Sequence, residues 1–254
     1  MRTKIRPLIL LLLGFFVLAA CQNPSKSIPK KILFIGNSYT AQVKNRLTTM
    51  LENSPYKETT FEFITKGGAT LKRHLNDTKV LDKIIAEKWD YVVLQDQSQV
   101  PALPEEAESF HNSVDTFTQH IREAGAQPLL YMTWGRRDGD QRNKEIFPDY
   151  QTMQNKLTEA YLSAAKRNHI AIAKVGEAWS IVRQHNPSLG NELYKKDGSH
   201  PSDKGAYVVC SILFRSLFND SLNTIHYENV LQKDEWEIIK QAVLNTDSQT
   251  PTSK

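Results

Sequence analysis

Two short segments, far apart in the sequence, together carry the residue types of a nucleophilic site. Ser38 follows an apolar run and a glycine, and Asp197 and His200 stand three positions apart near the other end of the chain. A serine hydroxyl is a weak nucleophile until a neighbouring base accepts its proton, and that base works best when a third group orients it. A tight turn would let the Asp197 carboxylate reach one ring nitrogen of His200. These residues therefore predict acyl transfer through a serine nucleophile.

Each of these residues also has an ordinary structural interpretation. A serine between a strand and a helix can cap the helix, because its side-chain oxygen accepts a backbone N–H of the first turn. A histidine on a loop is usually solvated. The two segments form a catalytic site only if the fold brings them together.

The pattern around Ser38 predicts a buried strand, a tight turn and a helix. Residues 32–35 are apolar, and the apolar residues after Ser38 recur at helical spacing. Four further apolar runs alternate with helical segments, and they span residues 60–64, 91–94, 128–132 and 170–173. Apolar strands that alternate with helices are typical of a parallel sheet covered on both faces. We therefore expect a three-layer, doubly wound (flavodoxin-like) α/β domain with five parallel strands.

In such a fold the carboxyl ends of the strands share one rim, where ligands bind. The rim would gather Ser38, Gly67-Gly68, and the loops at residues 95–99 and 134–140. Beyond the fifth strand we expect a short helix around Trp179, a core helix that includes Tyr207 to Leu217, and a C-terminal helix. The C-terminal helix carries Trp236, Ile239 and Val243 and should pack outside the core helix.

Two motifs resemble those of a known family. Residues 36–40, Gly-Asn-Ser-Tyr-Thr, resemble the nucleophile block of the SGNH (GDSL-type) hydrolases, with Asn where many members carry Asp. Residues 197–201, Asp-Gly-Ser-His-Pro, resemble the last block of that family and follow in the right order. The resemblance spans residues 32 to about 218. It implies an SGNH-type sheet and a serine esterase in which Ser38, His200 and Asp197 are catalytic.

The resemblance also implies an oxyanion hole, but the sequence departs from the family pattern there. The N–H groups of Ser38 and Gly68 would be two of its donors. Family members commonly carry Gly-x-Asn-Asp after the third strand, whereas this chain has Gln-Asp-Gln-Ser-Gln at residues 95–99. A glutamine amide can donate the same hydrogen bond one methylene further out. We favour Gln95, which is nearest the strand end, over Gln97. The run at residues 94–98, together with the runs at 132–135 and 175–179 and the block at Asp197, looks like a bacterial subgroup of unassigned substrate.

The loop after the fourth strand offers candidate substrate contacts. Trp134, Arg136 and Arg137 could bind substrate, but a loop salt bridge and a ring packed on the sheet edge would explain them equally well. One histidine and one aspartate are too few ligands for a metal site, so we expect neither metal nor cofactor.

The N-terminus predicts export and lipidation. Three basic residues precede an apolar stretch at residues 8–17, and Leu-Ala-Ala-Cys follows at residues 18–21. This is typical of a secretory signal peptide, and the cysteine resembles the bacterial lipobox. The resemblance implies cleavage before Cys21, a lipid on Cys21 and, because Gln22 follows, residence in the outer membrane. An uncleaved anchor with an incidental cysteine is the alternative. The predicted organisation is a signal peptide (1–20), the lipidated cysteine and tether (21–29), the SGNH-like domain (30–245) and a polar tail (246–254).

Composition excludes some classes of partner. The chain has 254 residues, with 32 basic and 28 acidic side chains, and three of the basic ones lie in the first twenty residues. The processed chain would therefore be close to neutral, which removes the argument for nucleic-acid binding. Of the two cysteines, Cys21 would carry lipid and Cys210 lies in an apolar run, so no disulfide framework is expected and Cys210 should be a buried small hydrophobe.

Three functions are compatible with these patterns. The favoured one is a lipid-anchored, monomeric serine esterase that faces the periplasm or the cell surface. Its substrate would be a small-molecule or glycan ester, with O-acetylated carbohydrate ahead of lipid esters because no long apolar loop lies near the site. The second is a catalytically weak or inactive lipoprotein of the same fold that binds glycans or assists envelope assembly. The third is a structural lipoprotein in which Ser38 is only a helix cap.

Overall fold

The computed structural model describes residues 30–225, 227 and 230–246. The predictions for the signal peptide, Cys21 and the tether lie outside these residues, as does all of the predicted tail except Thr246. Thr246 is buried, and its hydroxyl donates a hydrogen bond to the carbonyl of Val243 at 2.7 Å. The folded part of the chain therefore includes the first residue that we assigned to the tail.

The sheet has five parallel strands in the order β2-β1-β3-β4-β5. The strands are β1 (Lys31–Gly36), β2 (Thr60–Thr65), β3 (Tyr91–Leu94), β4 (Gln127–Tyr131) and β5 (Ala171–Ala173). Each lies within two residues of its predicted bounds, and β3 matches them at both ends. The doubly wound α/β fold is confirmed. Apolar runs located the strands well because both faces of a parallel sheet are buried.

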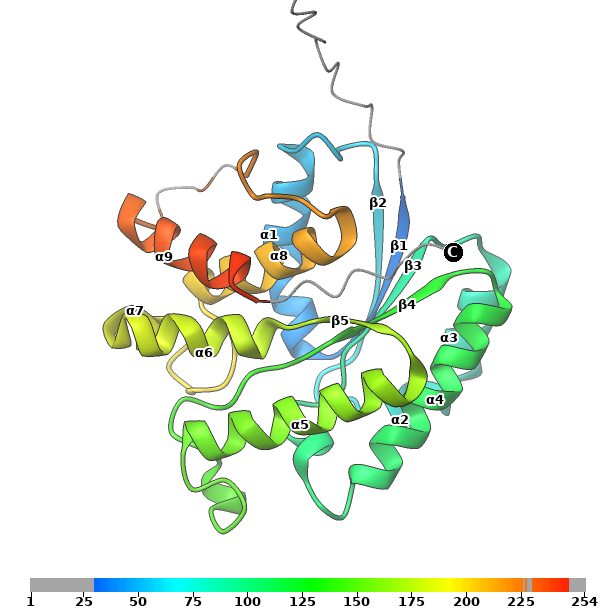
Figure 1. The fold of residues 1–254 in the computed structure, drawn as a ribbon. Coiled ribbons are helices and arrows are strands. Elements are labelled where there is room, and N and C mark those ends of the chain that lie inside the picture. Colours follow the sequence, from blue (N-terminus) through cyan, green and yellow to red (C-terminus); the bar gives the residue numbers. More distant parts are fainter. Residues whose placement is uncertain (1–29, 226, 228–229, 247–254) are drawn as a thin grey trace, which may run out of the picture.

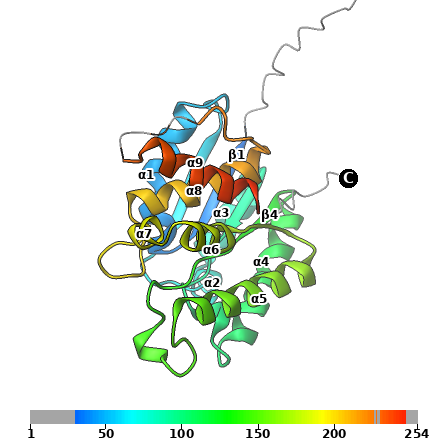
Figure 2. The same ribbon diagram turned by 60° about the vertical axis from the view of Figure 1, so that its left-hand side comes forward.

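Helices cover both faces of the sheet (Figures 1 and 2). One layer contains α1 (Ser38–Glu52), α6 (Val175–His185), α7 (Pro187–Glu192), α8 (Asp203–Phe218) and α9 (Lys233–Leu244). The other contains α2 (Leu71–Leu75), α3 (Thr78–Ala86), α4 (Ala107–Glu123) and α5 (Tyr150–Asn168). Strand β1 feeds both cores, since Ile32 and Phe34 pack into the first layer while Leu33 and Ile35 pack into the second.

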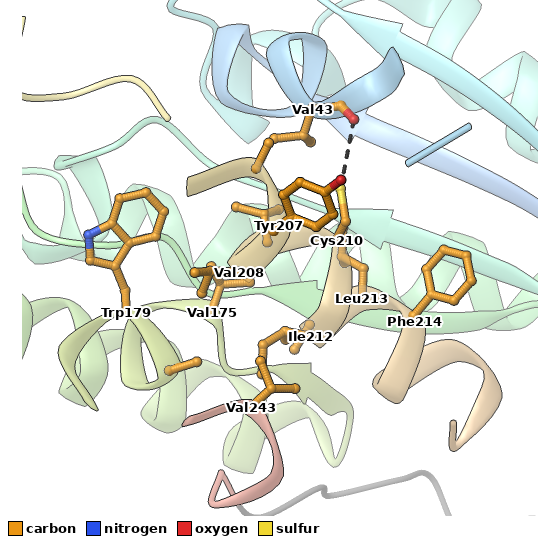
Figure 3. Close-up of a cluster of buried hydrophobic side chains, with 14 of the residues drawn as sticks. Val43, Val175, Trp179, Tyr207, Val208, Cys210, Ile212, Leu213, Phe214 and Val243 are labelled. Carbon is orange, nitrogen blue, oxygen red and sulfur yellow. Dashed lines mark hydrogen bonds between the residues drawn. The ribbon is translucent and has the colours of Figure 1, made fainter. Parts of the chain in front are cut away.

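Helix α8 is the centre of the first layer. Its buried side chains, Tyr207 and Cys210 among them, pack between α1, the sheet and α9, as Figure 3 shows. Cys210 is fully buried, and its Sγ lies 3.9 Å from the carbonyl oxygen of Val43. Burial raises the pKa of this thiol, so Cys210 is the inert, buried small residue that was predicted. Helix α9 packs outside α8 and α6, also as predicted.

Several short elements were not predicted. Helix α2 has five residues, and two single turns of 3-10 helix lie at Val100–Ala102 (η1) and Gln141–Asn143 (η2). Segments of this length are too short to show a helical period in the sequence. Within the part of the chain that the structure describes, no helix is both long and apolar enough to cross a bilayer.

Candidate active site

The turn between β1 and α1 sets the position of Ser38. Helix α1 begins at Ser38, and its N-cap is Asn37, whose Oδ1 accepts the N–H of Tyr39 at 3.0 Å. The interpretation of Ser38 as the cap is therefore wrong, because the preceding asparagine fills that role. Ser38 is left at the carboxyl edge of the sheet with its N–H in the first helical turn, where the helix itself supplies no acceptor.

Asn37 also ties this turn to its neighbours. Its side chain is buried, and its Nδ2 donates to the carbonyl oxygens of Ala69 at 3.1 Å and Asp96 at 3.3 Å. These two acceptors belong to the turns after β2 and β3. One amide thus connects the three turns that form this end of the site, and an aspartate at position 37 could not donate either bond while ionised.

Ser38, His200 and Asp197 form a continuous hydrogen-bonded chain. The Oγ of Ser38 lies 2.9 Å from Nε2 of His200, and Nδ1 of His200 lies 2.6 Å from Oδ2 of Asp197. The other carboxylate oxygen of Asp197 accepts the N–H groups of Ser199 (2.9 Å) and His200 (3.0 Å). Desolvation alone would raise the pKa of Asp197, but the hydrogen bonds from the His200 ring and these N–H groups outweigh it and lower the pKa. The fold therefore brings the two sequence motifs together.

The loop that carries Asp197 and His200 is closed by its own backbone. Tyr194 and Pro201 form an isolated antiparallel bridge, and the N–H of Lys195 donates to the carbonyl of His200 at 2.8 Å. Gly198 has a φ of 65°, in the left-handed region that favours glycine. The turn at Gly198 lets one carboxylate face both the ring and the backbone of His200.

Ser199 anchors this loop to the rest of the site. Its N–H donates to Asp197, its hydroxyl lies 2.6 Å from the phenol oxygen of Tyr39, and its carbonyl accepts Nε1 of Trp134 at 3.0 Å. The Tyr39 and Trp134 rings stack at 4.5 Å, and Trp134 stacks on Trp179 at 4.3 Å. Sequence reasoning missed Tyr39. Its position next to the nucleophile was the available signal.

The expected substrate contact at Trp134 does not fit its position. Trp134 is fully buried between two aromatic rings and does not line the pocket beside Ser38. The alternative of a ring packed at the sheet edge describes it. Arg137 is also outside the pocket lining: its side chain pairs with Asp138 at 2.9 Å, and its N–H donates to the carbonyl of Gly198. Arg136 lines the pocket, and it also forms the alternative that we left open, a loop salt bridge, with Asp140 at 2.8 Å.

A pocket of about 230 Å³ opens beside Ser38. It is lined by Asn37, Ser38, Tyr39, Gly68, Gln97, Ser98, Arg136, Ser199 and His200. Gly68 has a φ of 66° and lies in the pocket wall, and its role as an oxyanion donor stays a prediction. The lining is mainly polar in residue type, and it contains Ser38, His200 and several hydrogen-bond donors.

The structure separates the two candidate glutamines. Gln95 is fully buried behind the nucleophile turn, where its Oε1 accepts the N–H of Asn37 at 3.0 Å and the hydroxyl of Thr40 at 2.8 Å. A Cβ at Gly36 would lie 2.6 Å from that same oxygen, so the turn needs glycine there. Our preference for Gln95 as the oxyanion donor is thus at odds with its position, because the side chain lies buried under the turn and its Nε2 already donates to the carbonyl of Asp96.

Gln97 lies in the pocket wall instead. Its Oε1 accepts the N–H groups of Gln99 at 2.9 Å and Val100 at 3.3 Å. These two bonds fix the orientation of the side-chain amide. They use its acceptor oxygen and leave the Nε2 donor on the other side of the amide group.

Asp96 lies outside the pocket lining but bonds to two of the segments around it, and it was also missed. It is almost fully buried, and its Oδ1 accepts the N–H groups of Leu71 at 3.1 Å and Gln97 at 2.6 Å. Burial raises the pKa of Asp96 to about 7, although these two N–H groups act in the opposite direction. This carboxyl group therefore joins the turns after β2 and β3. Among the described residues, no group of three or more His, Cys, Asp or Glu side chains is arranged to hold a metal ion.

No protein-family model and no curated protein sequence matches this chain. Solved structures do. A protein from Slackia heliotrinireducens, provisionally described as an SGNH hydrolase, aligns over 75% of this chain and 100% of its own, with 27% identity and a TM-score of 0.63.

Two more distant structures share the fold. A DUF4886 family protein from Bacteroides uniformis covers 89% of this chain and 98% of its own at 19% identity, with a TM-score of 0.73. A catalytic mutant of an acetylxylan esterase from Geobacillus stearothermophilus covers 80% of this chain and 100% of its own at 14% identity, with a TM-score of 0.59. At these identities the likeness concerns the architecture alone.

Proposed function

The chain belongs to the SGNH hydrolase superfamily, and on that premise we propose that it is a carboxylic ester hydrolase with Ser38 as its nucleophile. The observation that carries the proposal is the hydrogen-bonded chain from Ser38 through His200 to Asp197. Ser38 and His200 line an open pocket. A helix cap or a solvated histidine would require neither contact. The hydrolase and esterase fold of the neighbours supports the same reaction class.

The proposed reaction has two acyl-transfer steps. His200 takes the proton of Ser38 through Nε2 as Oγ attacks the ester carbonyl, and Asp197 holds the ring through Nδ1. The tetrahedral intermediate collapses when His200 returns that proton to the leaving alcohol. Water then attacks the acyl-enzyme with His200 as base again, and the acid is released. Ser38 is regenerated, so the net change is the addition of water across the ester bond.

The oxyanion would be met by donors on the pocket wall. The N–H groups of Ser38 and Gly68 are two of them, and we assign the third to Nε2 of Gln97 rather than to Gln95. The side chain of Gln97 is already oriented by two backbone N–H groups, which reduces the entropy lost when it binds the oxyanion.

A small acyl group suits this site. The pocket is small and bordered mainly by polar residues, which favours an acetyl group over a long acyl chain. Two structural neighbours are named as acetylxylan esterases, and this supports an O-acetylated carbohydrate as the substrate of our chain. We further propose that lipid on Cys21 holds the enzyme at the cell envelope. Membrane fractionation of the full-length protein beside Cys21→Ala would test that anchor.

Hydrolysis of p-nitrophenyl acetate by the chain from Gln22 onward, compared with its Ser38→Ala variant, tests the reaction. We expect the variant to lose nearly all activity, and a fluorophosphonate probe to label the unaltered protein at Ser38. Equal rates for the two proteins would remove the nucleophile assignment. The remaining candidate would then be a glycan-binding lipoprotein of the same fold.

A further inference from the structure

The wall of the pocket beside Ser38 contains a guanidinium, that of Arg136, which the ester hydrolysis proposed above does not use. Arg136 is the one lining residue with a permanent charge, and no carboxylate is among the lining residues. The proposed reaction uses Ser38, His200, Asp197 and the oxyanion donors, and none of its steps needs Arg136. A guanidinium in so small a pocket therefore points to a group on the substrate other than the ester itself.

Arg136 is oriented from behind by Asp140. Its Nη1 donates to Oδ1 of Asp140 at 2.8 Å, and the Asp140 side chain is buried. The Asp140 carboxylate accepts two further hydrogen bonds, from the N–H of Arg142 at 3.1 Å and from Nδ2 of Asn143 at 3.0 Å. Asp140 thus fixes the guanidinium but stays outside the pocket lining.

The Nη2 atom of the guanidinium lies beside a second pocket residue. It is 3.5 Å from the hydroxyl of Ser98, at the long limit of a hydrogen bond, and both residues line the pocket. Nε of Arg136 is buried and has no hydrogen-bond partner. The backbone of Arg136 is held separately, since its N–H donates to Sδ of Met153 at 3.3 Å. A guanidinium that is held through Nη1 can donate from Nη2 to a carboxylate with little further loss of side-chain entropy.

Two exposed lysines lie near pocket residues in the sequence: Lys66 stands two positions before Gly68, and Lys196 directly precedes Asp197, whose own carboxylate is paired with His200. The nearby Asp138 is already paired with Arg137. Charges of one sign at the edge of a pocket raise the local concentration of oppositely charged ligands.

We propose that the substrate is an anionic ester, in which a carboxylate lies close to the scissile bond and is bound by Arg136 with Ser98. This inference rests on the proposed function, since it assigns the substrate class of the same site. The carboxylate could belong to the alcohol, as in an acetylated acidic sugar, or to the acyl group, as in a hemisuccinate. Both place a carboxylate within reach of the same guanidinium.

Two matched pairs of substrates separate these sources. O-acetylated methyl glucuronoside beside O-acetylated methyl glucoside tests the alcohol side, and p-nitrophenyl hydrogen succinate beside p-nitrophenyl butyrate tests the acyl side. We expect kcat/KM to be about tenfold higher or more for the charged member of one pair, because a charge-assisted hydrogen bond is worth roughly 1.5–3 kcal/mol. Equal rates, or a preference for the neutral member in both pairs, would overturn the proposal.

Variants locate the effect. Arg136→Gln should abolish the preference for the charged member, whereas Arg136→Lys should keep part of it. Arg142→Gln is the matched control, because Arg142 is exposed on the same loop and its side chain is outside the pocket lining. A full preference in Arg136→Gln, or its loss in Arg142→Gln, would contradict the assignment.

Binding measurements on Ser38→Ala do not depend on turnover. They also do not depend on Arg136→Gln, a variant that could fail to fold because it leaves the buried Asp140 without its cation. Ser38→Ala should bind methyl glucuronoside or succinate more tightly than methyl glucoside or butyramide, and salt should weaken the binding of the charged member. Absence of all hydrolysis would count against the proposed function, and this binding preference would still support or refute the anionic subsite. No preference in binding would refute the subsite alone.

Discussion

The phenol oxygen of Tyr39 and the hydroxyl oxygen of Ser199 lie 2.6 Å apart, although 160 positions separate them in the sequence. Tyr39 directly follows the proposed nucleophile, and Ser199 directly precedes the proposed base. Burial raises the pKa of Tyr39, which keeps its phenol neutral and able to donate. The bond thus joins the helix of the nucleophile to the loop of the base.

Removal of this bond should lower turnover more than substrate binding. In Tyr39→Phe the ring stack on Trp134 remains, but the hydroxyl of Ser199 loses its partner and the His200 loop loses one constraint. We expect kcat on p-nitrophenyl acetate to fall roughly fivefold, equivalent to about 1 kcal/mol, with KM changed less.

Ser199→Ala and the double variant complete a thermodynamic cycle for this pair. If the bond positions His200, both single variants and the double variant should show similar losses of kcat, since each removes the same interaction. Ser199→Thr keeps the hydroxyl and should recover most of the activity. Strictly additive losses in the double variant would show that the two hydroxyl groups act separately.

The sheet could be predicted from the sequence, but the details of the site could only partly be predicted. Apolar runs such as residues 91–94 located the strands because a strand that is buried on both faces of a parallel sheet is apolar along its whole length. The contact between Ser38 and His200 followed from recognisable motifs. Whether Gln95 or Gln97 faces the pocket depends on how the chain turns after β3. That turn is set by bonds from distant segments, since the N–H of Asn37 donates to Gln95 and the N–H of Leu71 donates to Asp96.

The two glutamines should therefore fail in different ways when truncated. Gln97→Ala should lower the free energy of unfolding less than Gln95→Ala, because the N–H groups of Gln99 and Val100 that lose their acceptor are only part-buried. It should reduce kcat, by up to about 3 kcal/mol of transition-state stabilisation if Nε2 meets the oxyanion. Gln95→Ala should instead destabilise the fold by about 1–3 kcal/mol, because it leaves the buried N–H of Asn37 and hydroxyl of Thr40 without their acceptor.

Urea unfolding and steady-state kinetics of both variants distinguish these outcomes. Each protein serves as the control for the other, since the two substitutions remove the same side chain two positions apart. A large kcat effect for Gln95→Ala in a protein of unaltered stability would reverse the assignment.

Asp197→Asn should reduce kcat by about 10³–10⁴-fold without preventing folding, because an amide can hold the His200 ring only in the wrong tautomer. The lowered pKa of Asp197 means that the folded state favours its ionised form, so its stabilising contribution is present above the unfolded pKa and fades as the pH falls through the folded value. The activity of the unaltered enzyme should thus not require protonation of Asp197. Kinetics of both proteins from pH 5 to pH 9 would check this, and an Asp197→Asn protein as active as the unaltered one would contradict the role.

Asp96 should make the stability of the fold depend on pH in the opposite direction. Its folded pKa is about 7, against about 3.9 for an unfolded aspartate, so the folded state holds a proton that the unfolded state releases between these values. The free energy of unfolding should therefore fall as the pH rises from 4 to 7 and level off above. Asp96→Asn keeps an oxygen for the N–H groups of Leu71 and Gln97 but cannot ionise, so it should lose this slope. Urea unfolding of both proteins at pH 5 and pH 8 tests the difference, in which other titrating groups cancel. A stability difference between the two proteins that stays the same at both pH values would show that Asp96 is already ionised in the folded state at pH 5.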